Sequence, residues 1–91
     1  MKLESMEVRV TGRVQRVGFR AWAASKAQAL GLSGWVRNEP DGSVTALLTG
    51  TPEALEAMLA ALHEGPGFAR VARVEADRAD PAPTAGFRVV R

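Results

Sequence analysis

A glycine-bounded segment rich in arginine is the part of the chain best suited to chemistry. It runs from Gly12 to Arg20 and reads Gly-Arg-Val-Gln-Arg-Val-Gly-Phe-Arg. Residues 7–11 before it alternate apolar and polar like a strand, and the residues after it have helical spacing. Unpaired N–H groups and the helix dipole attract anions to a helix N-terminus. We therefore expect an anion-binding loop that holds the phosphate of a small substrate.

Two residues would make this loop effective. Gly18 would let an anion approach the backbone closely, and Arg20, in the first helical turn, would direct two N–H donors at phosphate oxygens. The alternative is a polar connection with solvated arginines, because glycine-bearing loops before helices are common and this one lacks the Lys-Ser/Thr of a P-loop. The segment alone leaves both interpretations open.

The elements that must position this loop are well signalled. Phe19, Ala23, Ala27 and Leu30 share one helical face, and Gly31 then ends the helix. Next, we expect a hairpin made of a strand at 33–38, a turn at Pro40-Asp41-Gly42, and an extended stretch from Ser43 to Thr49.

A second helix is predicted to begin after Thr51, which can cap it, with Pro52 and Glu53 in its first turn. It should end at 65–67. Its apolar stripe consists of Leu55, Met58, Leu59 and Leu62. We expect a strand at 71–76 with either a bulge or a twist, because Val71 and Val74 break strict alternation. A loop at 81–83 and a closing strand at 87–90 should follow.

The resulting order is β-α-β-β-α-β plus a C-terminal strand, which indicates the α+β class. It predicts a ferredoxin-like α/β sandwich, an antiparallel sheet with two helices on one face. The 91 residues fit one domain, 1–91, of which we expect 1–5 to form a flexible N-terminal tail.

Composition excludes several classes of function. The chain has no cysteine, which rules out disulfides, thiolate catalysis and Cys-ligated metals. Its net charge of +2 is too small for a nucleic-acid footprint. Residues 1–7 do not resemble a signal peptide, and no apolar run approaches the roughly 20 residues of a membrane span. We expect a cytoplasmic monomer that binds neither nucleic acid nor membrane.

Two motifs in the chain resemble those of the acylphosphatase family. Val14–Arg20 is similar to the signature V-Q-G-V-x-F-R, and Gly34–Asn38 to the motif G-W-V-x-N, with Asp41–Val44 matching a D-G-x-V turn. The likeness covers nearly the whole chain, continuing through residues 65–66, 69–71 and 86–89.

This resemblance implies an enzyme that hydrolyses acyl phosphates to a carboxylate and inorganic phosphate, with no metal or cofactor. By the same resemblance, Arg20 matches the arginine that binds the phosphate and Asn38 the asparagine that orients the attacking water. The backbone amides that share the phosphate would be those of Gln15, Arg16, Val17, Gly18, Phe19 and Arg20.

Arg16 departs from the family pattern, because it stands where the signature has glycine. A positive φ there would cost a non-glycine residue about 1 kcal/mol. We expect an ordinary φ, with Arg16 adding positive field at the mouth of the site.

Two other classes of protein would share this fold or this anion-binding loop. A nucleic-acid-binding module would stack bases on aromatic residues of its central strands, but residues 43–49 contain none. A non-catalytic anion-sensing domain would not need the water-orienting Asn38.

Other conspicuous residues are expected to have structural roles. We expect His63 to be solvated near a helix end, Trp22 and Trp35 to pack in the core or at an edge, and Glu39 and Asp41 to serve the turn. A solvated face is expected for Arg70, Arg73, Arg78, Arg88 and Arg91.

Overall fold

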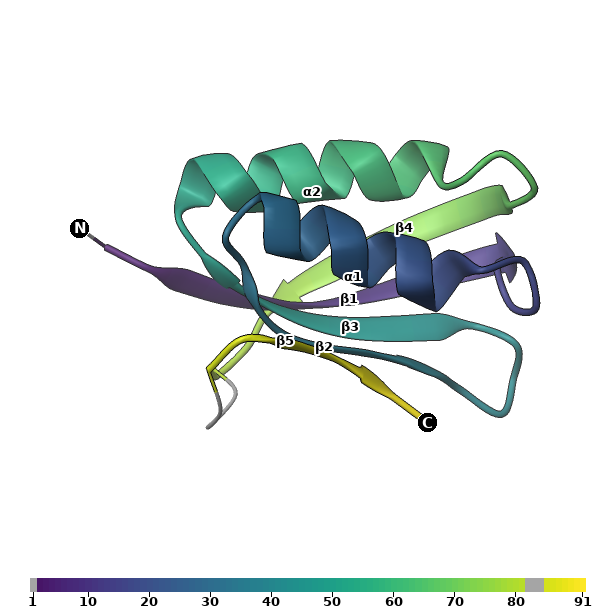
Figure 1. The fold of residues 1–91 in the computed structure, drawn as a ribbon, viewed down its shortest axis with the longest axis horizontal. Helices are drawn as coiled ribbons and strands as arrows, with labels where there is room; N and C mark the ends of the chain where they lie inside the picture. Colours follow the sequence, from purple (N-terminus) through teal and green to yellow (C-terminus); the bar gives the residue numbers. More distant parts are fainter. Residues whose placement is uncertain (1, 82–84) are drawn as a thin grey trace.

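The computed structural model describes residues 2–81 and 85–91. It contains five strands and two helices in the predicted order (Figure 1). In chain order they are β1 (Glu4–Arg13), α1 (Phe19–Ala29), β2 (Ser33–Asn38), β3 (Val44–Gly50), α2 (Pro52–Glu64), β4 (Arg70–Arg78) and β5 (Phe87–Val90). Neither helix is long and apolar enough to cross a membrane.

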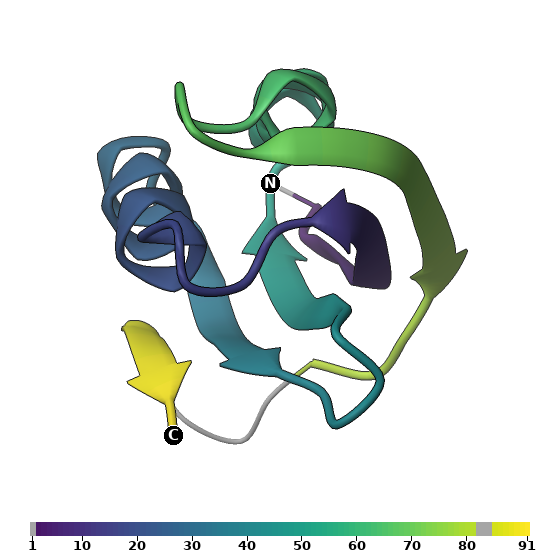
Figure 2. The ribbon, with the colours of Figure 1, turned by 90° about the vertical axis from the view of Figure 1, so that its right-hand side faces the viewer.

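The five strands form one sheet in the order β4-β1-β3-β2-β5, and both helices cover the same face (Figures 1 and 2). The pairs β1–β3, β1–β4 and β2–β3 are antiparallel, as predicted. The prediction is wrong for β5, which runs parallel to β2 and makes the sheet mixed. The cause is topological: β4 runs opposite to β2, so a strand that turns back after β4 runs in the direction of β2.

The core lies between the sheet and the helices. Val8 and Val10 point into it because alternate residues of a strand share one face. Phe19, Ala23 and Ala27 meet them from α1 and are also buried, as the helical spacing predicted. The core-facing residues of α2 are Leu55, Met58 and Leu62. This packing fixes the start of α1 over the sheet.

The N-terminal strand is longer than predicted. It begins at Glu4, so Glu4 and Ser5 belong to the sheet and not to a tail. The hydroxyls of Ser5 and Thr49 hydrogen-bond across the β1–β3 pair at 2.7 Å. Met1 of the predicted tail and residues 82–83 of the predicted loop lie outside the described residues.

Of the bulge or twist expected in β4, the structure shows the bulge. Thr11 pairs with Arg73 and Gly12 with Val71, which leaves Ala72 as the extra residue. Gly12 has φ 121°, and a Cβ there would collide with the backbone of β4. After this shift the pairing resumes, and it sets the register at the end of β1.

Candidate functional site

The loop from Val14 to Gly18 connects the end of β1 to the start of α1. Val14 is buried, whereas Arg16 and Gly18 have left-handed backbones, with φ of 64° and 75°. The first helical hydrogen bond runs from the Trp22 N–H to the Gly18 carbonyl at 3.0 Å. Within the described residues, no backbone N–H of residues 15–20 donates a hydrogen bond. A left-handed residue within such a run of N–H groups makes a concavity that suits an anion.

The expectation of an ordinary φ at Arg16 is wrong. Its φ of 64° lies in the left-handed region, which costs a non-glycine residue about 1–2 kcal/mol. On one side of Arg16, the Gln15 side chain is hydrogen-bonded to the β2–β3 turn. On the other side, α1 begins just beyond Gly18. Few residues are therefore left to reverse the chain, and the left-handed conformation of Arg16 contributes to that reversal.

Gln15 joins the loop to the β2–β3 turn. Its Nε2 donates to the carbonyl oxygens of Glu39 and Ser43, both at 2.8 Å. Sequence reasoning assigned Gln15 only a backbone role and missed this clamp. The motif position of Gln15 marked it as significant, but nothing local identifies partners 24 and 28 residues away.

Arg20 is half-buried and is held by the last strand. Its Nη1 donates to the carbonyl oxygen of Val90 at 3.0 Å. The ion pairs among the described residues are Arg9–Asp41 and Arg37–Glu39, so Arg20 has no carboxylate partner there. The guanidinium is thus oriented by a neutral group, and no carboxylate among the described residues pairs with it.

Asn38 ends β2 beside the loop. Its Oδ1 is buried and has no hydrogen-bond partner among the described residues. A buried acceptor without a donor costs about 1–3 kcal/mol, so this oxygen favours a ligand or water that donates to it.

A depression of about 200 Å³ brings these groups together. It is lined by Val14, Arg16, Gly18, Phe19, Arg20, Ala21, Asn38 and Val89. Both residues predicted to be catalytic, Arg20 and Asn38, are among them. Of the other predicted site residues, Gln15 and Val17 are not part of this lining: the Gln15 amide contacts the hairpin, and Val17 lines a neighbouring depression.

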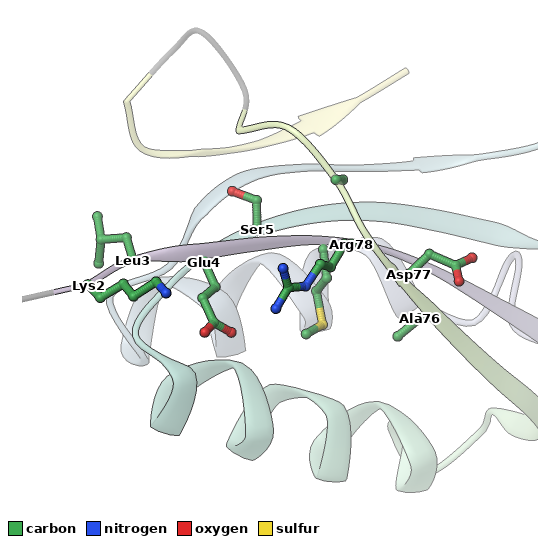
Figure 3. A pocket seen from close by; sticks show the side chains of 9 residues that line it. Lys2, Leu3, Glu4, Ser5, Ala76, Asp77 and Arg78 are labelled. Atoms are coloured by element: carbon green, nitrogen blue, oxygen red, sulfur yellow. The ribbon is translucent and has the colours of Figure 1, made fainter.

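Two further depressions differ in character. One, of about 650 Å³, adjoins the first and is lined by Arg13, Arg16, Val17, Gly67, Phe68 and Arg70. The other, of about 390 Å³, lies where β1 begins and β4 ends (Figure 3). The rise of a strand places it about 30 Å along β1 from the loop. Glu4, Asp77 and Arg78 give that distant depression charges of both signs.

Of the two carboxylates that follow Asn38, that of Asp41 serves the turn, as predicted, whereas that of Glu39 pairs with a strand residue. Asp41 Oδ1 accepts hydrogen bonds from the backbone N–H of Ser43 at 2.9 Å and from its hydroxyl at 2.6 Å. Glu39 Oε2 accepts from Arg37 Nε at 2.8 Å. This bond, with a smaller contribution from the Thr45 hydroxyl, lowers the pKa of Glu39 below its ordinary 4.5.

His63 and the two tryptophans also behave as predicted. His63 is exposed in the last turn of α2. The rings of Phe19 and Trp22 pack with centroids 5.4 Å apart, and the guanidinium of Arg37 lies 4.6 Å from the centroid of the Trp35 ring.

Comparison with known proteins identifies the family of this chain. Residues 6–89 match the family model Acylphosphatase. The acylphosphatase of Thermococcus kodakarensis is 48% identical over 90 residues, which cover 99% of both sequences. That of Rhizobium meliloti is 53% identical over 85 residues, covering 92% of this chain and 90% of the relative.

Solved structures give the same result. An acylphosphatase from Coxiella burnetii superposes with a TM-score of 0.92 at 33% identity, covering 97% of this chain and 93% of the other. One from Bacillus subtilis superposes with a TM-score of 0.91 at 32% identity, covering 99% and 100%. This chain belongs to the acylphosphatase family, enzymes that hydrolyse the carboxyl-phosphate anhydride of acyl phosphates.

Proposed function

We propose that the backbone amides of residues 15–20 and the guanidinium of Arg20 hold the phosphate of an acyl phosphate, while Asn38 orients the water that attacks it. The oxygen of that water forms a bond to phosphorus, and the bond from phosphorus to the acyl oxygen breaks. The acyl part leaves as a carboxylate, and the phosphate product carries the water oxygen and its protons, one of which passes to solvent at neutral pH.

This reaction needs little general acid or base catalysis from the enzyme. A carboxylate is a weak base with a pKa of about 4, so it leaves without being protonated. The barrier then depends on placing water in line and on stabilising charge on the phosphoryl oxygens. Positioned amides and one arginine supply the stabilisation, and a carboxamide that both accepts and donates supplies the placement.

The observation that carries the proposal is the unpartnered Oδ1 of Asn38, a residue that lines one small depression together with Arg20 and Gly18. An anion on the loop and a water donating to Asn38 would satisfy the groups that the fold leaves without partners.

The hydrogen bonds around the site support the same assignment. Gln15 holds the loop against the turn that follows Asn38, and Val90 holds Arg20. Both bonds pre-arrange the binding groups before substrate arrives, which is how a site built on electrostatics gains rate.

The two alternatives fare less well. A non-catalytic anion sensor would use the loop and Arg20 equally well, but it gives no role to the acceptor of Asn38. A nucleic-acid module would need aromatic residues on the central strands β1 and β3, and these strands have none.

The proposal is tested with benzoyl phosphate in the presence of EDTA, in water enriched in ¹⁸O. We expect saturable hydrolysis above the spontaneous rate, competitive inhibition by inorganic phosphate, and the label in the phosphate product. Label in benzoate would overturn attack at phosphorus, and the lack of turnover would overturn the enzyme. Activity without a metal, the monomeric state and a cytoplasmic location stay predictions from the sequence.

A further inference from the structure

Beside the phosphate-sized depression lies a larger one, and Arg16 lines both. The smaller holds about 200 Å³ and the larger about 650 Å³. A phosphate bound at the loop therefore has a second, roomier space next to it, reached past the Arg16 side chain. An acyl phosphate joins its phosphate directly to its acyl group, so the larger space is positioned to take the acyl part.

The charged side chains around this second depression are all positive. Its lining includes Arg13, Arg16 and Arg70 and no carboxylate. None of the three arginines takes part in an ion pair within residues 2–81 and 85–91.

Two of these arginines are held opposite one another by the backbone. Arg13 and Arg70 are direct partners in the antiparallel β1–β4 ladder, in the register set by the bulge at Gly12. Like charges directly opposite in a sheet repel and destabilise it. An anion placed between them would remove that repulsion and gain two charge-assisted hydrogen bonds.

The same space has an apolar side. Phe68 is 85% exposed in the α2–β4 connection, where the hydrogen bond from the Ala69 N–H to the Pro66 carbonyl, at 2.9 Å, orders the chain. Val17 contributes further apolar surface from the loop. A short carbon skeleton would lie against these two residues while its far end meets the arginines.

We propose that Arg13, Arg16, Arg70 and Phe68 form an acyl subsite that selects acyl phosphates carrying a second anionic group, a carboxylate or a phosphate, at the far end of the acyl part. This inference rests on the proposed function, because the acyl group reaches the subsite only when its phosphate is on the loop.

The test compares benzoyl phosphate with 4-carboxybenzoyl phosphate. An ionised para-carboxylate changes the leaving group little, and each rate is divided by the spontaneous rate of that compound. We expect kcat/KM to be about five- to tenfold higher for the carboxylated substrate, as for one or two exposed ion pairs. The ratio should fall towards one at high salt, because screening weakens exposed pairs.

Variants of the proposed subsite test which arginines cause the preference for the carboxylated substrate. Arg13→Gln and Arg70→Gln should each lower this ratio by about two- to threefold. The matched control is Arg78→Gln, which removes an equal charge at the far end of β4, about 26 Å away along the strand. A wild-type ratio of one, or an equal drop in Arg78→Gln, would refute the subsite. Circular dichroism checks that each variant is folded.

A binding experiment separates this inference from the proposed function. Calorimetry with benzylphosphonate and 4-(phosphonomethyl)benzoate, which are not hydrolysed, gives the same comparison without turnover. Failure to hydrolyse benzoyl phosphate would overturn the proposed function alone. Equal affinity for the two phosphonates would overturn the subsite, whatever the enzyme does with benzoyl phosphate.

Discussion

The side-chain amide of Gln15 donates a 2.8 Å hydrogen bond to the backbone carbonyl of Glu39, the residue directly after Asn38. The same amide reaches the carbonyl of Ser43 on the other side of the turn. One side chain thus ties the proposed phosphate loop to the strand that carries the proposed water-orienting residue. We expect the separation between the loop and Asn38 to depend on this clamp.

Replacing Gln15 by methionine keeps the side-chain length and removes both hydrogen bonds. Because the two carbonyls keep backbone partners, we expect the free energy of unfolding to fall by only about 1–2 kcal/mol in urea titrations. We expect kcat to fall more than phosphate affinity, since Asn38 moves relative to the loop. Gln28→Met, at an exposed position of α1, is the control. A Gln15 variant with unchanged kcat would show that the clamp does not position Asn38.

Replacing Arg20 by glutamine removes the proposed phosphate anchor. We expect kcat/KM for benzoyl phosphate to drop roughly 30- to 150-fold, which corresponds to a loss of about 2–3 kcal/mol of transition-state stabilisation. Inhibition by phosphate should also become weaker. Arg20→Lys should recover only part of this, because one ammonium cannot bond Val90 and grip phosphate as a guanidinium fork does. An inhibition constant for phosphate that does not change in Arg20→Gln argues against the anchor.

Replacing Asn38 by alanine removes the water-orienting amide. We expect kcat to fall at least tenfold, with little change in the inhibition constant for phosphate. Stability should hold or rise, because the variant no longer buries an unsatisfied acceptor. Thermal melts and steady-state kinetics on the same samples measure both effects. Full activity in Asn38→Ala would remove the residue from the mechanism.

Replacing Arg16 by glycine should have opposite effects on stability and activity. The left-handed backbone suits glycine, so we expect about 1 kcal/mol of added stability. The lost guanidinium should raise KM. Arg16→Gln keeps the strain and loses the charge, so it should raise KM without added stability. If both variants have the same stability, the backbone strain at residue 16 is negligible.

The lowered pKa of Glu39 leads to a prediction for how the free energy of unfolding changes with pH. The Arg37 guanidinium holds the pKa of Glu39 below 4.5, the value it approaches when unfolded. The native state therefore favours the charged carboxylate, so this contribution is present above about pH 4.5 and is lost as pH falls through the lower folded pKa. Glu39→Gln should lose less stability than wild type as the pH falls below about 4.5 and through the lower folded pKa of Glu39. Glu56→Gln, on an exposed part of α2, controls for the general loss of one charge.

The local elements follow from the sequence because their causes are local. The helical spacing of Phe19, Ala23 and Ala27 predicted the buried face of α1, and Pro52 after Thr51 predicted the start of α2. The turn at Gly42, and the strands either side of it, also agree with prediction. Periodicity, capping and turn chemistry act within a few residues, so one sequence suffices to read them.

The sequence predicted which residues the candidate site contains, but not the hydrogen bonds that position them. Arg20 and Asn38 were identified through motifs, and the fold brings both to one depression. Gln15 and Val90, which hold the loop and the arginine, were not assigned these roles. Their bonds span 24 and 70 residues, and no local pattern encodes a partner at that distance.

The sequence by itself therefore determined the elements, their order and the two residues expected to do the chemistry. Tertiary structure alone decided the left-handed backbone of Arg16, the parallel direction of β5 and the opposition of Arg13 to Arg70. These depend on strand register, on the route of the connections and on constraints from distant contacts. Such features arise only when the whole chain packs, because they are set by what lies across the sheet and not by neighbours along the chain.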